Sequence, residues 1–96
     1  MHAVTRTYSG EGASELFDRI AAASKEVEGL LRGVEGFVSY TFFRTEDGGV
    51  TITVCQDKAG TDDSVQKAKD WIGKNASDIG ASAPKVSEGP AILHLK

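Results

Sequence analysis

The chain has few of the residues that would indicate a disulfide framework, an exported protein or a membrane protein. Among its 96 residues there is one cysteine, Cys55, which excludes an internal disulfide and fits a reducing compartment. No apolar run approaches the roughly 20 residues of a membrane span. Residues 1–6 lack the apolar core of a signal peptide. The expectation is therefore a cytoplasmic protein with no membrane partner.

Basic patches, metal-binding patterns and complete cofactor motifs are also missing. The formal net charge is −3 and the 11 Lys and Arg residues form no basic run, which argues against a nucleic-acid partner. No His, Cys, Asp or Glu spacing resembles a metal site. Gly10-Glu11-Gly12 lacks the third glycine of a phosphate-binding turn, and Glu11 would repel a phosphate. We expect no metal and no cofactor.

What the sequence does contain is a strong hairpin pattern over residues 36–57. Two runs rich in Val, Ile, Thr, Phe and Tyr, residue types that suit strands, flank a polar, glycine-containing turn. In that turn Asp47-Gly48-Gly49 supplies residues that adopt a positive φ with little strain. Because the chain is short and 40% apolar, the hairpin is expected to belong to one domain that spans residues 1–96.

One strand and one helix are expected on each side of this hairpin. Residues 2–8 alternate as a strand, and residues 13–32 carry an apolar stripe at helical spacing that ends at Gly33 in the left-handed conformation. A second helix begins with Thr61 as its N-cap. A loop over residues 79–90 and a strand over residues 91–96 complete the chain.

The resulting βαββαβ order predicts an α+β, ferredoxin-like sandwich, a four-stranded antiparallel sheet with two helices on one face. Burying Arg6 under the helices would be expensive, which places Ala3, Thr5 and Thr7 toward the helices instead. The uncovered face is then expected to carry five residues from the first and last strands, namely Val4, Arg6, Tyr8, Ile92 and His94.

The register of the hairpin has two alternatives. A three-residue turn pairs Tyr40 with Ile52, whereas a two-residue turn at Asp47-Gly48 places Thr41 opposite Val54. Both alternatives leave large aromatic residues on the uncovered face, and such a face does not usually stay in water. A second copy of the sheet is the simplest cover, so we expect a homodimer whose two sheets close into a barrel.

A resemblance can be named on three segments. The strand-helix opening, the segment GFVSYTFFRTEDGGVTITVCQDKAG and the helix SVQKAKDWIGKN resemble the dimeric α/β-barrel superfamily, in particular antibiotic biosynthesis monooxygenase-like proteins. The resemblance implies a homodimer and, in the oxygenase branch, oxidation of an aromatic substrate without a cofactor. The haem-degrading branch uses an Asn on its first strand and a His near a helical Trp. This chain has no Asn in residues 2–8 and no His near Trp71, so haem degradation is not expected.

The candidate ligand-binding residues follow from the face assignment. Arg6 and His94 are candidates to hold an organic anion, with His94 as the candidate catalytic base toward a phenol. The alternative is that each meets a carboxylate of the other subunit, or water at the end of the barrel. The candidate aromatic walls are Tyr8, Tyr40, Phe43 and Trp71. Trp71 has a simpler interpretation as a residue that closes the edge of the core. Likewise, Cys55 is more simply a buried residue than a nucleophile.

Three functions are consistent with these residues. The first is binding or oxidation of a small aromatic or anionic metabolite in a pocket between sheet and helices, which the resemblance favours. The alternative is a non-catalytic homodimeric module that binds a ligand or a protein. A cysteine-based enzyme that uses Cys55 ranks last, because only His2 and His94 are available as bases.

Overall fold

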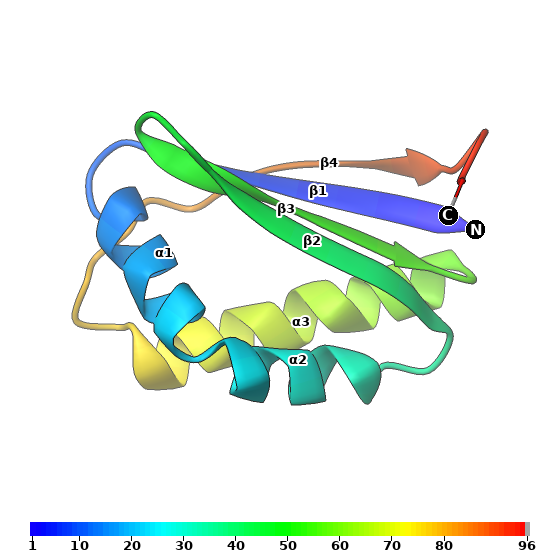
Figure 1. The fold of residues 1–96 in the computed structure, drawn as a ribbon, viewed down its shortest axis with the longest axis horizontal. Coiled ribbons are helices and arrows are strands. Elements are labelled where there is room, and N and C mark those ends of the chain that lie inside the picture. Colours follow the sequence, from blue (N-terminus) through cyan, green and yellow to red (C-terminus); the bar gives the residue numbers. More distant parts are fainter. Residues whose placement is uncertain (96) are drawn as a thin grey trace.

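The computed structural model describes residues 1–95 as an antiparallel sheet of four strands with three helices on one face (Figure 1). The elements are β1 (His2–Ser9), α1 (Ala13–Ala22), α2 (Ser24–Arg32), β2 (Phe37–Thr45), β3 (Gly48–Cys55), α3 (Lys58–Asn75) and β4 (Lys85–Pro90). The strand order is β2-β3-β1-β4. The ferredoxin-like sandwich predicted from the sequence is therefore confirmed. Within residues 1–95, no helix is long and apolar enough to cross a membrane.

The apolar stripe predicted as one helix is shared by two helices, α1 and α2. At Ala23 the backbone leaves helical geometry, with φ −105° and ψ 26°, and its N–H donates to the carbonyls of both Arg19 and Ile20. The bend allows α1 to pack on β3 while α2 reaches β2 and α3. The helical period of residues 13–32 is thus confirmed, and the single continuous helix is wrong.

The ends of the helices also differ from the prediction. α3 begins at Lys58 because the side chain of Asp57 caps it, accepting a hydrogen bond of 3.0 Å from the N–H of Gly60. Thr61, the predicted N-cap, lies inside the first turn. Gly33 follows α2 in a right-handed conformation, with φ −79°. The left-handed residue of this connection is Gly36, with φ 77°.

The last strand is β4 and not residues 91–96. β4 pairs with β1 along its whole length, and beyond Pro90 only Met1 remains, whose carbonyl accepts a hydrogen bond of 2.9 Å from Ala91. The segment then leaves the sheet, and Ile92 is fully exposed. Lys96, the end of the predicted strand, lies outside the described residues. The alternation in this segment thus predicted a strand at residues that have no β1 backbone left to pair with, because β4 already occupies that edge of β1.

β1 faces the opposite way from the prediction. Val4, Arg6 and Tyr8 are buried beneath the helices, whereas Thr7 on the other face is exposed. Alternation along a strand ties Val4, Arg6 and Tyr8 to the same face. Val4 and Tyr8 bury far more apolar surface than Ala3, Thr5 and Thr7 could, and this gain outweighs the cost of taking one guanidinium inside.

The hairpin has neither of the two predicted registers. Thr45 pairs with Gly48, which leaves Glu46 and Asp47 as the turn, and an irregularity after Phe37 shifts the pairing. β2 places Tyr40 and Phe42 opposite Thr53 and Thr51, on the face that β1 turns to the helices. Phe43 is consequently the aromatic residue that the hairpin leaves on the uncovered face.

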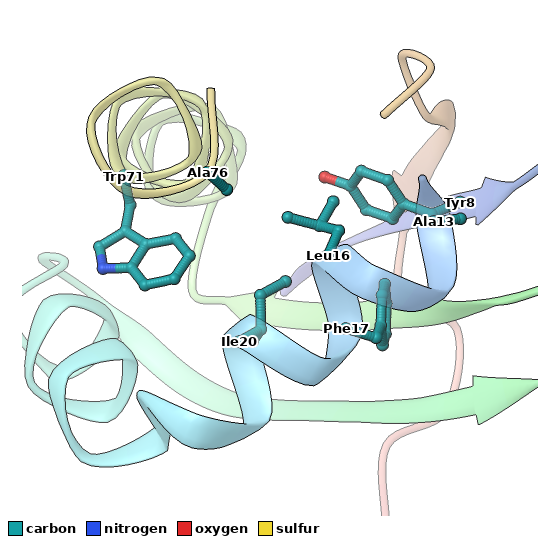
Figure 2. Close-up of a cluster of buried hydrophobic side chains, with 7 residues drawn as sticks. All are labelled: Tyr8, Ala13, Leu16, Phe17, Ile20, Trp71 and Ala76. Carbon is teal, nitrogen blue, oxygen red and sulfur yellow. The ribbon is translucent and has the colours of Figure 1, made fainter. Parts of the chain in front are cut away.

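Phe17 of α1 is the centre of the aromatic packing between helices and sheet (Figure 2). Its ring meets those of Tyr8 and Phe42 edge to face, with centroids 5.7 Å and 6.2 Å away. A Cβ atom on Gly49 would lie 2.2 Å from Cε2 of Phe17. Gly49, expected to supply a positive φ in the turn, is therefore needed within β3 because it lets α1 approach the sheet.

We expect Gly49→Ala to destabilise the protein by about 1–3 kcal/mol, because Phe17 is fully enclosed and cannot move away from the added methyl group. Gly73→Ala is the matched control. Nothing lies within 4 Å of the position of its Cβ, so the better helix former should stabilise the protein by about 0.5–1 kcal/mol. Denaturant unfolding of both variants measures the change in the free energy of unfolding. A Gly49→Ala variant as stable as the wild type would contradict the close packing of Phe17 on Gly49.

Candidate functional site

Arg6 is the polar centre of the space between sheet and helices. The residue is 5% exposed, and its Nη1 donates a hydrogen bond of 3.0 Å to the hydroxyl of Tyr8. Its guanidinium also lies 5.8 Å from the centroid of the Tyr8 ring. None of the ion pairs among residues 1–95 includes Arg6. Arginine is almost never buried this deeply without a partner, so its unused donors favour an anion.

Two tyrosine hydroxyls accompany Arg6. Burial raises the pKa of both Tyr8 and Tyr40 above the ordinary value, and the positive charge of Arg6 opposes this only in part. Both phenols are therefore neutral near pH 7. Because the oxygen of Tyr8 accepts from Arg6, its own proton stays available for a ligand oxygen.

Thr51 is a polar residue of the site that sequence reasoning missed. It lies on β3 directly opposite Arg6, and its Oγ1 is buried without a hydrogen-bond partner among the described residues. A hydroxyl between Val50 and Ile52 in a strand is the sequence signal for such a residue. That signal carries meaning only once the face that β3 turns to the helices is known.

Two cavities meet these polar groups. The smaller one, with about 30 Å³ of free volume, lies between the sheet and the helices and is lined by Arg6, Tyr8, Tyr40, Thr51, Ile20, Val27, Leu30, Leu31, Lys67, Ala68, Trp71 and Ile72. A larger one of about 280 Å³ also reaches Arg6 and Tyr8, on the side of α3 that faces β4. Among residues 1–95, no group of three or more His, Cys, Asp and Glu side chains could hold a metal ion.

The small cavity brings together four of the six predicted ligand-binding residues, namely Arg6, Tyr8, Tyr40 and Trp71. They meet on the helix side of the sheet, whereas the face assignment had placed Arg6 and Tyr8 between two sheets. Phe43 points to the opposite face and is 46% exposed. His94 follows β4 and lines neither cavity, so the structure does not bring the candidate base to Arg6.

Trp71 both closes the core and forms a wall of the small cavity. It is buried in one cluster with Leu16, Ile20 and Ala76. Figure 2 shows its six-membered ring directed toward this cluster and its nitrogen on the side turned away from it. That nitrogen is buried and has no hydrogen-bond partner among the described residues. The six-membered ring of Trp71 thus closes the edge of the core, as one interpretation predicted, and the side chain also forms a wall of the small cavity, as the other did.

Cys55 has the properties of a structural residue. Its side chain is completely buried, and burial raises the pKa of its thiol, with the nearby charges of Asp57 and Asp63 acting in the same direction. Both effects disfavour the thiolate that a nucleophile requires. The interpretation of Cys55 as a buried residue is confirmed, and a cysteine-based reaction gains no support.

Comparison with known proteins finds likeness in structure only. No family model matches the chain, and no curated protein matches it. A protein of unknown function from Nitrosomonas europaea superposes with a TM-score of 0.71 at 16% identity, over 99% of this chain and 91% of that one. A Streptomyces coelicolor monooxygenase from the gene ActVA-Orf6, in complex with nanaomycin D, superposes with a TM-score of 0.64 at 19% identity, over 99% of this chain and 90% of that one.

SnoaB, a cofactor-independent oxygenase from Streptomyces nogalater, superposes with a TM-score of 0.58 at 16% identity, over 98% of this chain and 93% of that one. Identities this low show a common fold and leave the activity of this chain open. They agree with the resemblance noted in the hairpin and its flanking helices. In its fold the chain is therefore similar to the antibiotic biosynthesis monooxygenase-like proteins.

Proposed function

We propose that this protein binds a small aromatic metabolite with an anionic oxygen between its sheet and its helices, and that Arg6 holds the anion. The observation that carries the proposal is the burial of Arg6 without a carboxylate partner among the described residues. A guanidinium can bind a carboxylate with two parallel hydrogen bonds, and in a water-poor site such bonds are strong. The neutral hydroxyls of Tyr8 and Thr51 add donors beside it.

The chemistry that we propose is oxidation by O2 without a cofactor, by analogy with SnoaB, which is a cofactor-independent oxygenase. A phenol acidic enough to be ionised near neutral pH gives its electrons to O2 directly, as the phenolate. One oxygen atom enters the ring, and the other leaves as water with the ring C–H hydrogen that it replaces and one proton from solvent, which balances the proton that the phenol lost on ionising. The product is a quinone. Arg6 would stabilise the phenolate, and the apolar walls between the sheet and the helices would keep water away from the reacting ring.

A second candidate, a non-catalytic homodimeric binding module, is favoured by the uncovered face of the sheet. Phe43 is 46% exposed there, and Val50 and Ile52 are only half-buried. All three residues alternate with the side chains that β2 and β3 direct to the helices. A second copy of the sheet would cover this face, and the dimer is compatible with either function.

We expect Arg6→Met to weaken the binding of benzoate at least tenfold, a loss of about 1.4 kcal/mol. Met keeps an apolar stem and removes the charge, so the unliganded variant should be no less stable than the wild type. Arg44→Met is the matched control, because Arg44 is half exposed and pairs with Asp18. Calorimetric or NMR titration measures the affinities, and equal binding by all three proteins would exclude Arg6 as the anion site.

We expect sedimentation of the wild type at micromolar concentration to show twice the chain mass of 10.2 kDa. A dimer of this kind should bury roughly 1,200 Å² or more of total surface. Phe43→Asp should yield a folded monomer, because it places a charge in the proposed interface. Lys25→Glu on the exposed surface of α2 should stay dimeric. A folded wild-type monomer would contradict the proposed dimer and leave the Arg6 site untouched.

A further inference from the structure

The two cavities that meet at Arg6 differ in what they can hold. The small cavity has about 30 Å³ of free volume, and the larger one, here called the α3–β4 chamber, has about 280 Å³. Arg6, Tyr8 and Ile72 line both. A cavity of roughly 150 Å³ is enough for benzene in a protein interior. A single aromatic ring therefore fits the chamber as it stands, whereas the small cavity would have to expand several-fold.

The walls of the α3–β4 chamber suit the apolar body of a ligand. α1 and α3 contribute Leu16, Val65 and Ile72, and the connection from α3 to β4 contributes Ala81, Ala83 and Pro84. Val86 of β4, Gly73 of α3 and the polar Ser82 complete the wall. Besides Arg6 at the inner end, the charged lining residue is Lys69, which is exposed. The chamber thus offers an apolar space with positive charge at its inner end.

Neither cavity is lined by a His, Asp, Glu or Cys side chain that could take a proton from a ligand. The titratable lining residues are Arg6 and Tyr8 on β1, Tyr40 on β2, and Lys67 and Lys69 on α3. α1, α2, β3, β4 and residues 81–84 contribute none to either lining. The pKa values of Tyr8 and Tyr40 are raised by burial, so both phenols act as donors.

Two carboxylates on elements that border the cavities are already paired. Glu28 of α2 lies beside Tyr40 in the neighbouring groove and forms an ion pair with Arg32. Glu88 of β4 pairs with His2 and Lys58. The polar groups that reach a ligand at Arg6 are therefore donors of hydrogen bonds, and a general base is missing from the two linings.

We infer that the ligand is a compact aromatic acid that enters already ionised, with its anionic oxygen on Arg6 and Tyr8 and its ring in the α3–β4 chamber beneath residues 81–84. The inference rests on the proposed function and adds the position of the ring and the ionisation state. Carboxylic acids and acidic phenols qualify as ligands. Neutral isosteres and weakly acidic phenols do not, because they bring no charge and find no base.

The position of the ring is tested with benzoate and two cavity-filling variants. Val86→Trp fills the chamber from a residue that is 45% exposed and should tolerate the larger side chain. Ala68→Val fills the small cavity. Dissociation constants from NMR titration should rise at least tenfold for Val86→Trp and less than twofold for Ala68→Val. Ala83→Phe, on the facing wall of the chamber, replaces Val86→Trp if the latter fails to fold.

The opposite pattern would be weaker benzoate binding by Ala68→Val and unchanged binding by the chamber variants. It would place the ring in the small cavity and overturn the inference, while Arg6 would remain the anion site. Benzoate binding that Arg6→Met leaves unchanged would instead overturn the proposed function. A wild-type protein that binds neither benzoate nor 4-nitrophenolate would overturn the ligand class as well.

The ionisation state is tested with the neutral isostere benzamide and with pH. Benzamide should bind at least tenfold more weakly than benzoate. The affinity for benzoate should stay constant between about pH 6 and 8, because neither lining contains a His, Asp, Glu or Cys side chain. The affinity for 4-nitrophenol should fall as the pH drops below the pKa of this phenol. A benzoate affinity that changes over the same interval would reveal a titrating protein group and contradict the inference.

Discussion

A guanidinium held beneath the helices without a carboxylate is the constraint on which the rest of this structure depends. Arg6 is carried inside because it alternates with Val4 and Tyr8, whose burial stabilises the sandwich. The surrounding groups satisfy its charge only in part, since its hydrogen-bond partners among residues 1–95 are the neutral hydroxyls of Tyr8 and Tyr40. The cost of that burial is reduced when an anion binds, so a feature unfavourable to the empty protein becomes the basis of the proposed site.

Tight packing and open space lie at different parts of the same layer. Where α1 meets the sheet, Phe17 packs onto Gly49 so closely that a methyl group would not fit. Around α3 the packing is looser, and cavities open on both sides of the helix. The α1 contact therefore supplies rigidity, while α3 and residues 81–84 border the space proposed for the ligand. A site supported in this way can keep an unpaired charge without loss of the fold.

The sequence predicted most of the elements, and its errors have local physical causes. The 3.6-residue period of residues 13–32 survives the bend at Ala23, because the apolar stripe continues on α2. Asp57 rather than Thr61 caps α3. Both are good N-cap residues, and which of them is used depends on where β3 ends. The alternation of residues 91–95 suited a strand, but the position of β4 depends on pairing with β1, which is not local information.

For the site, the sequence alone determined which residue types were available and that Arg6, Tyr8, Tyr40 and Trp71 could serve one ligand. The tertiary structure decided where they meet. An alternating strand specifies two sets of side chains but does not say which set faces the helices, and a one-residue change of register exchanges the sets. The choice depends on apolar area summed over the whole sandwich, which outweighed the charge of Arg6. Only the folded structure shows that Thr51 belongs to the site and that His94 and Phe43 line neither cavity, because only the fold settles which face of each strand is buried.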